Sequence, residues 1–242
     1  MNAQVITGAL QAWAEAGWIR RLDAAFARFL VEVCPDAAPP VVLAAALTAQ
    51  VEGQGHACLP VDEFLHDAQA LLAWPAPAHE ALRSLMAGLP VDRDSWLAAL
   101  RASPLVAVDD GGAAPAAGAS PLVLRGARLY LRRYWRYERQ VASQVLQRIE
   151  ATAEVDAAAA RAWLDRLFAP GADAGPDWQK LACGVALRGG LTLVTGGPGT
   201  GKTTTAARLL ALLLATDPAP QRLRVALAAP TGKAAARLAQ AI

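Results

Sequence analysis

The sequence is poor in cysteine and histidine, which argues against two kinds of stabilising site. Its three cysteines, Cys34, Cys58 and Cys183, are scattered along the chain and form no Cys-x-x-Cys pair. An odd, dispersed set of this kind supports neither a disulfide framework nor a structural zinc site. His56 together with Cys58 supplies at most two metal ligands, and the other two histidines show no ligand spacing.

The sequence also has no long apolar run and no strong net charge. Its longest apolar stretches, such as residues 209–215, are far shorter than the roughly 18 residues that a membrane span needs. The N-terminus has neither the basic region nor the apolar core of a secretion signal, so we expect a cytoplasmic protein without membrane contact. The net charge of +2 is too small to indicate nucleic-acid binding by itself.

Apolar residues, by contrast, are abundant and mostly arranged with helical periodicity. The chain has 242 residues, of which 55% are hydrophobic, enough for the core of one or two domains. The periodicity predicts helices over residues 18–33, 41–51, 62–72, 94–100 and 151–168. In the first of these the apolar side is formed by Trp18, Leu22, Phe26, Phe29, Leu30 and Val33. A strand is expected at residues 105–108, followed by a flexible hairpin loop at 109–120, and a linker is expected at 169–176.

One segment mixes arginine with aromatic residues. Its arginines and aromatics are Arg125, Arg128, Tyr130, Arg132, Arg133, Tyr134, Trp135, Arg136, Tyr137 and Arg139. Such a mixture can bind single-stranded nucleic acid by charge and stacking. The same spacing also fits a solvated helix face, and we favour packing and partner contact over DNA. The segment is expected to form a hairpin, residues 122–124 and 127–131, and to become helical from about Arg132.

A phosphate-binding motif lies between an expected strand and an expected helix. The pattern Gly-x4-Gly-Lys-Thr follows the apolar run 191–194 and precedes the helix-like run 204–214, which is the context that this motif requires. Glycines let the loop turn its N–H groups toward phosphate oxygens. Lys202 can reach the β- and γ-phosphates, and the Thr203 hydroxyl is suited to coordinate Mg²⁺. The residues predicted to bind ATP here are Gly196, Gly197, Pro198, Gly199, Thr200, Gly201, Lys202, Thr203 and Thr204.

A second strand, loop and helix follow the first. Residues 223–229 are predicted to form a buried strand and 234–242 a helix, which would begin a parallel α/β sheet with both loops at its carboxyl edge. In the second loop, Thr231, the Gly232 N–H, Lys233 and the nearby Arg237 are able to contact a phosphodiester backbone. A turn that merely starts a helix explains the same residues equally well.

Upstream of the phosphate loop, Gln179 precedes a predicted helix over residues 180–188. An amide offers one donor group and one acceptor, which matches the adjacent N7 and N6 of adenine. A glutamine at a helix start is more commonly a capping or solvated residue.

Three sequence segments together resemble the RecD family, the alpha chains of exodeoxyribonuclease V. They are Asp-Trp-Gln-Lys at 177–180, Val-Thr-Gly-Gly-Pro-Gly-Thr-Gly-Lys-Thr-Thr-Thr at 194–205 and Leu-Ala-Ala-Pro-Thr-Gly-Lys-Ala-Ala-Ala-Arg-Leu at 227–238. Residues 55–59 and 129–138 resemble N-terminal segments of the same family. The family consists of superfamily 1 DNA helicases that move 5′ to 3′.

The resemblance implies a role for each motif. Gln179 would be the adenine reader, Lys202 and Thr203 the Walker A pair that binds ATP and Mg²⁺, and Pro230, Thr231, Gly232 and Lys233 the contact with single-stranded DNA. It also implies large partner subunits in a RecBCD-like heterotrimer that repairs double-strand breaks by recombination. The expected fold class is α/β: a mainly helical N-terminal module followed by the first half of a RecA-like P-loop NTPase domain with a parallel sheet.

The expected organisation has four parts, and the last is incomplete. Residues 1–104 would form the partner-binding helical module, 105–131 a small β-hairpin element, 132–175 a helical connector and 176–242 the start of the ATPase domain. The family continues with a Walker B acidic strand and an arginine finger, which this sequence lacks. Its only acidic residue after Thr203 is Asp217, in an expected loop. We therefore expect an N-terminal portion of a helicase, without complete hydrolysis machinery of its own.

Two other functions fit parts of the sequence. A nucleotide kinase or GTPase would use the same loop for phosphoryl transfer to a small acceptor. A GTPase would normally need an Asn-Lys-x-Asp segment, which is absent from these residues. A non-catalytic interaction fragment fits the N-terminal helices alone.

Overall fold

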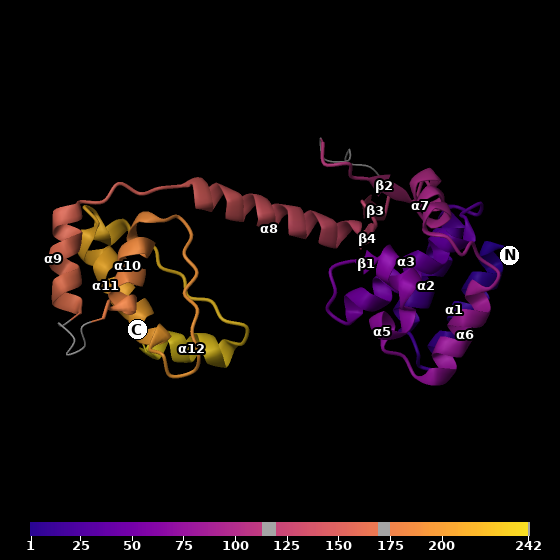
Figure 1. Ribbon diagram of the computed structural model, residues 1–242, viewed down its shortest axis with the longest axis horizontal. Helices are drawn as coiled ribbons and strands as arrows, with labels where there is room; N and C mark the ends of the chain where they lie inside the picture. The colour runs from indigo at the N-terminus through magenta and orange to yellow at the C-terminus, as the bar shows by residue number, and fades with distance from the viewer. Residues whose placement is uncertain (113–119, 169–174, 242) are drawn as a thin grey trace. The chain divides into compact units, whose positions relative to one another are not determined.

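A computed structural model describes residues 1–112, 120–168 and 175–241 (Figure 1). The chain divides into two compact units, Met1–Gln140 and Val141–Ile242, which are described separately below. No helix among the described residues combines the length and the apolar character that crossing a membrane requires.

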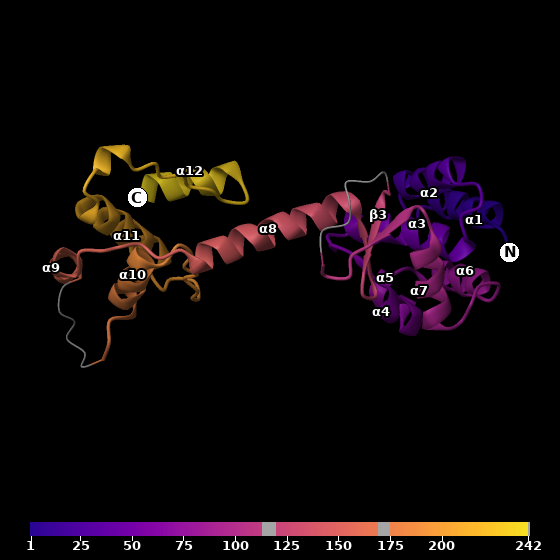
Figure 2. The same cartoon turned by 90° about the horizontal axis from the view of Figure 1, so that it is seen from above.

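The first unit is built on helices. They are α1 (Ala3–Glu15), α2 (Arg21–Val33), α3 (Pro39–Gly53), α4 (Val61–His66), α5 (Ala68–Leu72), α6 (Ala76–Met86), α7 (Arg93–Ala102) and the first part of α8 (Arg132–Glu150). At the centre lies α3, which packs against α1, α2, α7 and two strands of the sheet (Figure 2). Proline at its first helical position starts α3, and residues 40–51 are buried on every side. The predicted helix at 41–51 is therefore confirmed.

Helix α2 is confirmed as an element, but its predicted apolar face is only partly right: Leu30 is buried, and Trp18 and Phe26 pack against the core. Leu22, Phe29 and Val33 are exposed, and the helix buries Asp23 with small or apolar residues one and two turns later, Ala27 and Leu30. The reason is an ion pair at the helix start. The Arg20 guanidinium bonds the buried Asp23 carboxylate at 2.7 Å and also donates to the Ala49 carbonyl of α3, which turns the Asp23 side of α2 inward.

The predicted single helix over 62–72 is divided in two. Asp67 ends α4, and its side chain accepts a hydrogen bond from the Ala70 N–H, so that it caps α5. A side-chain cap of this kind satisfies an N–H group that the helix start leaves without a partner. The predicted helix at 94–100 is confirmed as α7.

A four-stranded sheet covers one side of α3. Its order is β1 (Leu59–Pro60), β4 (Arg128–Leu131), β3 (Leu122–Arg125) and β2 (Val106–Val108). The predicted hairpin is confirmed, because β3 and β4 pair antiparallel around Gly126, whose φ of +58° suits glycine. The hairpin loop predicted at 109–120 is wrong: β2 pairs parallel with β3, which requires a crossover connection. Most of that connection, residues 113–119, lies outside the described residues.

Over its described residues, 141–168 and 175–241, the second unit contains the rest of α8 and four further α-helices. They are α9 (Ala157–Leu167), α10 (Trp178–Arg188), α11 (Lys202–Thr216) and α12 (Gly232–Ala241), with a short 3-10 helix, η1 (Pro220–Arg222). Helices α9, α10 and α11 pack side by side (Figure 1) around a small core of Ala160, Phe168, Cys183, Leu187 and Leu212. The predicted helix at 151–168 begins only at Ala157, because the Asp156 carboxylate caps it by accepting from the Ala158 and Ala159 N–H groups. Most of the linker predicted at 169–176 lies outside the described residues.

The two strands predicted in this unit differ from the structure. Residues 191–194 and 223–229 run without strand pairing among the described residues, so the predicted parallel sheet is not formed there. A parallel strand is held by hydrogen bonds to neighbouring strands and is buried on both faces. Without such neighbours the apolar side chains stay accessible, and Leu193 is 82% exposed. The helices that follow the two segments are confirmed, with α11 starting at Lys202 and α12 at Gly232.

Candidate nucleotide site

The phosphate loop leads directly into the N-terminus of α11. Gly199 and Gly201 both have a φ of +78°, a region in which a Cβ is strained, so the glycines are required by the backbone path. Gly201 is the N-cap of α11. The free N–H groups of the first helical turn and the positive end of the helix dipole therefore border the loop, where they favour an anion.

Hydrogen bonds within the loop fix the position of Lys202. Its ammonium group donates to the Gly196 carbonyl at 2.7 Å and to the Gly197 carbonyl at 2.6 Å. The Thr200 hydroxyl also donates to the Gly197 carbonyl, at 2.9 Å. The loop thus curves around the Lys202 side chain and holds the ammonium group at the loop mouth.

The threonines of the first turn have different environments. Thr203 and Thr204 are exposed beside Lys202, so the Thr203 hydroxyl is accessible from solvent. Thr205 is buried, and its hydroxyl donates to the Gly201 carbonyl at 3.0 Å. Thr205 therefore holds the first turn, while Thr203 remains available for a ligand.

Gln179 lies against this loop, although it is 21 residues away from Thr200 in sequence. The Asp177 carboxylate starts α10 by accepting from the Gln179 and Lys180 N–H groups. The side-chain amide of Gln179 then donates from Nε2 to the Thr200 carbonyl at 3.2 Å. It lies so near the loop that a Cβ on Gly201 would be 2.6 Å from Nε2. The structure thus brings the predicted adenine reader and the predicted phosphate loop together.

Sequence reasoning missed one residue of this site, Arg208 on α11. Its guanidinium donates to the Gln179 Oε1 atom at 3.4 Å and lies over the Phe168 ring, 4.6 Å from the ring centre. A signal was present in the sequence, because Arg208 is the only charged residue between Thr203 and Thr216. A lone cation in an otherwise apolar helix needs a local partner.

Cys183 packs against the first turn of α11, on the buried side of the site. It is fully buried on α10, its thiol donates to the Thr205 carbonyl at 3.5 Å, and burial raises the pKa of the thiol above its ordinary value. The thiol is therefore protonated at neutral pH and acts as a packing group rather than as a nucleophile.

Comparison with known proteins shows which family the chain belongs to. Residues 15–130 match the family model described as RecBCD enzyme subunit RecD, N-terminal domain, and residues 179–242 match the model of the AAA domain. The RecBCD enzyme subunit RecD of Mycolicibacterium smegmatis is 43% identical over 216 residues, which are 86% of this chain and 32% of that protein. Its counterpart from Mycobacterium tuberculosis is 38% identical over 248 residues, 98% of this chain and 36% of that protein. The chain belongs to the RecD family.

This RecD-family chain spans about a third of the length of the curated relatives that it matches. A more distant one, the RecBCD enzyme subunit RecD of Haemophilus influenzae, is 31% identical over 216 residues and is likewise covered over 32% of its length. The AAA match over residues 179–242 includes Gln179, the phosphate loop and α12, and it agrees with the expected RecA-like half.

The second predicted motif of the RecD-family chain starts α12. The Thr231 hydroxyl accepts a hydrogen bond from the Ala234 N–H at 3.2 Å, so this side chain caps the helix, as the simpler interpretation of the motif requires. Pro230, Gly232, Lys233 and Arg237 are exposed and make no side-chain hydrogen bond to the phosphate loop in the part of the chain that the structure describes. Their contact with DNA stays a prediction.

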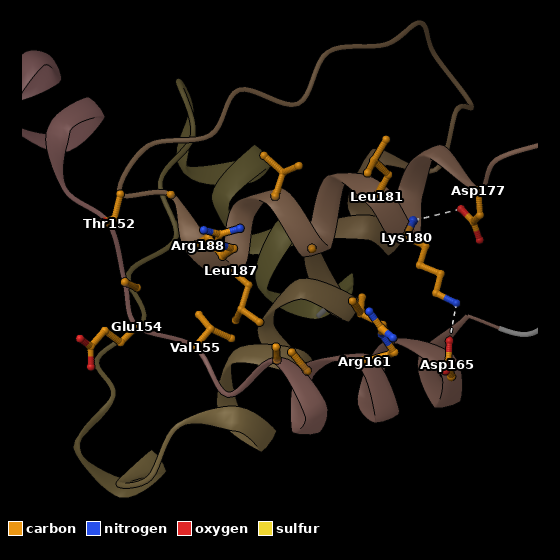
Figure 3. Close-up of a pocket in the computed structure, with 17 residues that line it drawn as sticks. Thr152, Glu154, Val155, Arg161, Asp165, Asp177, Lys180, Leu181, Leu187 and Arg188 are labelled. Atoms are coloured by element: carbon orange, nitrogen blue, oxygen red, sulfur yellow. Dashed lines mark hydrogen bonds and ion pairs between the residues drawn. The ribbon is translucent and has the colours of Figure 1, made fainter.

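A groove of about 1470 Å³ lies between α9 and α10 (Figure 3). Leu164, Leu181 and Val185 are among its apolar lining residues, and two further lining residues, Lys180 and Asp165, form an ion pair of 2.6 Å. None of the predicted ATP-binding residues lines it. The groove is therefore separate from the predicted ATP-binding residues.

Part of the arginine-rich segment makes contacts within the first unit. Arg125 and Arg139 lie 3.7 and 3.9 Å from the buried Asp109 carboxylate, and Arg132 donates to the Ser120 carbonyl. Arg133 stacks on the Tyr134 ring at 4.8 Å. These contacts show that part of the segment packs within the unit, whereas Arg128, Arg136 and Tyr137 are exposed. The preference for partner contact over DNA stays a prediction.

Proposed function

We propose that this chain is the ATP-binding part of a DNA helicase subunit that unwinds double-stranded ends 5′ to 3′ within a RecBCD-type complex. The observation that carries the proposal is the constellation around Lys202. Its ammonium is held at the mouth of a glycine loop, at the N-terminus of α11, with the Gln179 amide against the same loop. In a member of the RecD family, this constellation fits Mg-ATP.

The proposed roles follow from the chemistry of each group. The loop N–H groups and the end of α11 would bind the phosphates, and Lys202 would neutralise charge on the β- and γ-phosphates. Gln179 would read the adenine edge. The exposed Thr203 hydroxyl next to Lys202 fits a Mg²⁺ ligand, and the metal would stabilise charge on the phosphate oxygens.

The proposed partners are single-stranded DNA and the large subunits of a RecBCD-like heterotrimer in the cytoplasm, where the complex would repair double-strand breaks. The exposed segment from Pro230 to Lys233, with Arg237 one turn later, offers two cations and a helix start to a DNA backbone. The helices of residues 1–104 would contact the partner subunits. The names of the relatives, which describe RecBCD enzyme subunits, support this assignment.

Titration of a fluorescent Mg-ATP analogue tests the core of the proposal. Wild type should bind, and Lys202→Ala should weaken binding by at least about tenfold, because the phosphate charge loses its side-chain counter-ion. Lys180→Ala is the matched control, since that lysine is paired with Asp165. Equal affinity of wild type and a folded Lys202→Ala would remove the phosphate site. Displacement by GTP as effective as by ATP would favour the GTPase alternative.

A further inference from the structure

The amide of Gln179 is bound at both ends by the protein. Nε2 donates to the Thr200 carbonyl at 3.2 Å, and Oε1 accepts from the Arg208 guanidinium at 3.4 Å. A carbonyl can only accept and a guanidinium can only donate. Of the two orientations that differ by a 180° turn of the amide, therefore, only one satisfies both neighbours.

Arg208 is itself held in place. Its guanidinium lies 4.6 Å from the centre of the Phe168 ring, and Phe168 is 3% exposed. A cation over an aromatic face is attracted by the ring, more strongly where water is excluded. The stacked guanidinium has a planar, fixed set of donors, which a flexible lysine would not provide. Arg208 thus presents its N–H group to Gln179 from a fixed position.

We propose that Arg208 is a positioning residue that fixes the Gln179 amide and thereby selects adenine over guanine. This inference rests on the proposed function, because it requires that Gln179 read the base of ATP. Arg208 would not touch the nucleotide base; it would act through Gln179.

The selection follows from counting donors and acceptors. After its bonds to Thr200 and Arg208, the amide retains one N–H group and one oxygen lone pair. Adenine offers a donor at N6 and an acceptor at N7, so the fixed amide matches both atoms, and a turned amide would match neither. Guanine offers two acceptors, O6 and N7, so one of them faces the amide oxygen in either orientation. Fixing the amide orientation therefore increases the affinity for adenine and does not increase the affinity for guanine.

Mg-ATP and Mg-GTP titrations of wild type and four variants of the full chain test this inference. Arg208→Met keeps an unbranched apolar side chain and removes the donors, and it should lower ATP affinity by about fivefold to tenfold, because the Gln179 amide loses one of the two bonds that fix its orientation. Its GTP affinity should stay within about twofold of wild type, since the guanine mismatch does not depend on the amide orientation. Arg208→Lys should recover part of the preference for ATP. In a Gln179→Ala background, Arg208→Met should cause no further change in the ratio of ATP affinity to GTP affinity, here called the ATP-to-GTP ratio.

The outcomes separate this inference from the function on which it rests. Equal loss of ATP and GTP binding in Arg208→Met would show a merely structural role and overturn the inference. An unchanged ATP-to-GTP ratio in Arg208→Met, with a lowered ratio in Gln179→Ala, would also overturn it while leaving the adenine role of Gln179 in place. A wild-type chain that binds no Mg-ATP, or a Gln179→Ala variant with an unchanged ratio, would overturn the proposed function of Gln179 and the inference together.

Discussion

The indole N–H of Trp135 donates a 2.9 Å hydrogen bond to the carboxylate of Asp109. The bond joins α8 to the chain just after β2, in the interior of the first unit, where Asp109 is 2% exposed. Burial alone would raise the pKa of this carboxyl group, but the bonds from Trp135 and the Gly111 N–H, with the charges of Arg139 and Arg125, lower the pKa below its ordinary value. The folded state therefore favours the ionised form.

Asp109→Asn should destabilise the first unit in a pH-dependent way. At pH 7 the free energy of unfolding should fall by about 1–3 kcal/mol, because a buried charge with several partners is replaced by a neutral amide. The pKa of the Asp109 carboxyl is lower in the folded state than in the unfolded chain, where it is about 3.9. The carboxylate therefore contributes its full stabilisation above about pH 3.9, and this contribution is lost as the pH falls through the folded-state pKa. Urea denaturation should show that the difference between wild type and Asp109→Asn shrinks over that acid range.

The neighbouring carboxylate supplies the control for this experiment. Asp110 is exposed, so Asp110→Asn should change the free energy of unfolding by no more than about 0.5 kcal/mol. Equal losses in the two variants, or a difference from wild type that persists below the folded pKa, would contradict the role given to Asp109.

Gly201→Ala should damage both the fold and the ligand site of the second unit. Its φ of +78° strains an alanine, and the new Cβ would meet the Gln179 Nε2 atom at 2.6 Å. Strain and contact together should lower the free energy of unfolding by about 1–3 kcal/mol. Gly197→Ala is the matched change within the same loop, because its Cβ would meet only the Thr200 methyl group at 4.0 Å. If urea denaturation gave the same free energy of unfolding for both variants, the backbone geometry at Gly201 would not be required for stability.

The sequence predicted best those elements that are determined locally. Proline before an apolar run marks α3, glycine between apolar runs marks the β3–β4 turn, and the phosphate motif marks the start of α11. The predictions that were wrong concern features that depend on residues distant in the sequence. The buried face of α2 is set by the contact of Arg20 with Ala49, and the parallel pairing of β2 with β3 cannot be read from a Gly-rich connection.

The candidate site divides in the same way. The loop residues could be named from their spacing, because the motif is contiguous. The contact of Gln179 with Thr200 joins the start of α10 to the phosphate loop, and the sequence did not predict it. The family resemblance implied only that Gln179 reads adenine. Arg208 was missed because its partners, Gln179 and Phe168, are 29 and 40 positions away in the sequence and become neighbours only when α9, α10 and α11 pack.

Lys233→Ala should weaken binding to single-stranded DNA by a similar factor for all sequences. The exposed ammonium would contact phosphate rather than a base, so its loss should also reduce the slope of log affinity against log salt by about 1. Fluorescence anisotropy with oligonucleotides of different sequence, at several salt concentrations, measures both effects. Lys180→Ala, which removes a cation already paired with Asp165, should leave the slope unchanged. A wild-type slope in Lys233→Ala would exclude this lysine from the DNA path.

The polypeptide of residues 1–242 should bind Mg-ATP without turning it over. Hydrolysis needs an acidic residue that holds Mg²⁺ from a second side, a group that places the attacking water and a cation on the developing charge. After Thr203 the only acid in these residues is Asp217. It follows the last residue of α11, about 22 Å along the helix from Lys202 at 1.5 Å per residue, and its carboxylate caps the next turn by accepting from the Ala219 N–H.

A phosphate-release assay with and without single-stranded DNA, on material whose mass corresponds to residues 1–242, measures this directly. We expect saturable binding of the nucleotide and no DNA-stimulated phosphate release. Asp217→Asn should match wild type in both measurements, because its carboxylate lies at the opposite end of α11 from the loop. DNA-stimulated release that is lost in Asp217→Asn would make this residue the catalytic acid. Release that survives in Asp217→Asn would require a catalytic carboxylate among the residues before the phosphate loop, since no other acid follows it.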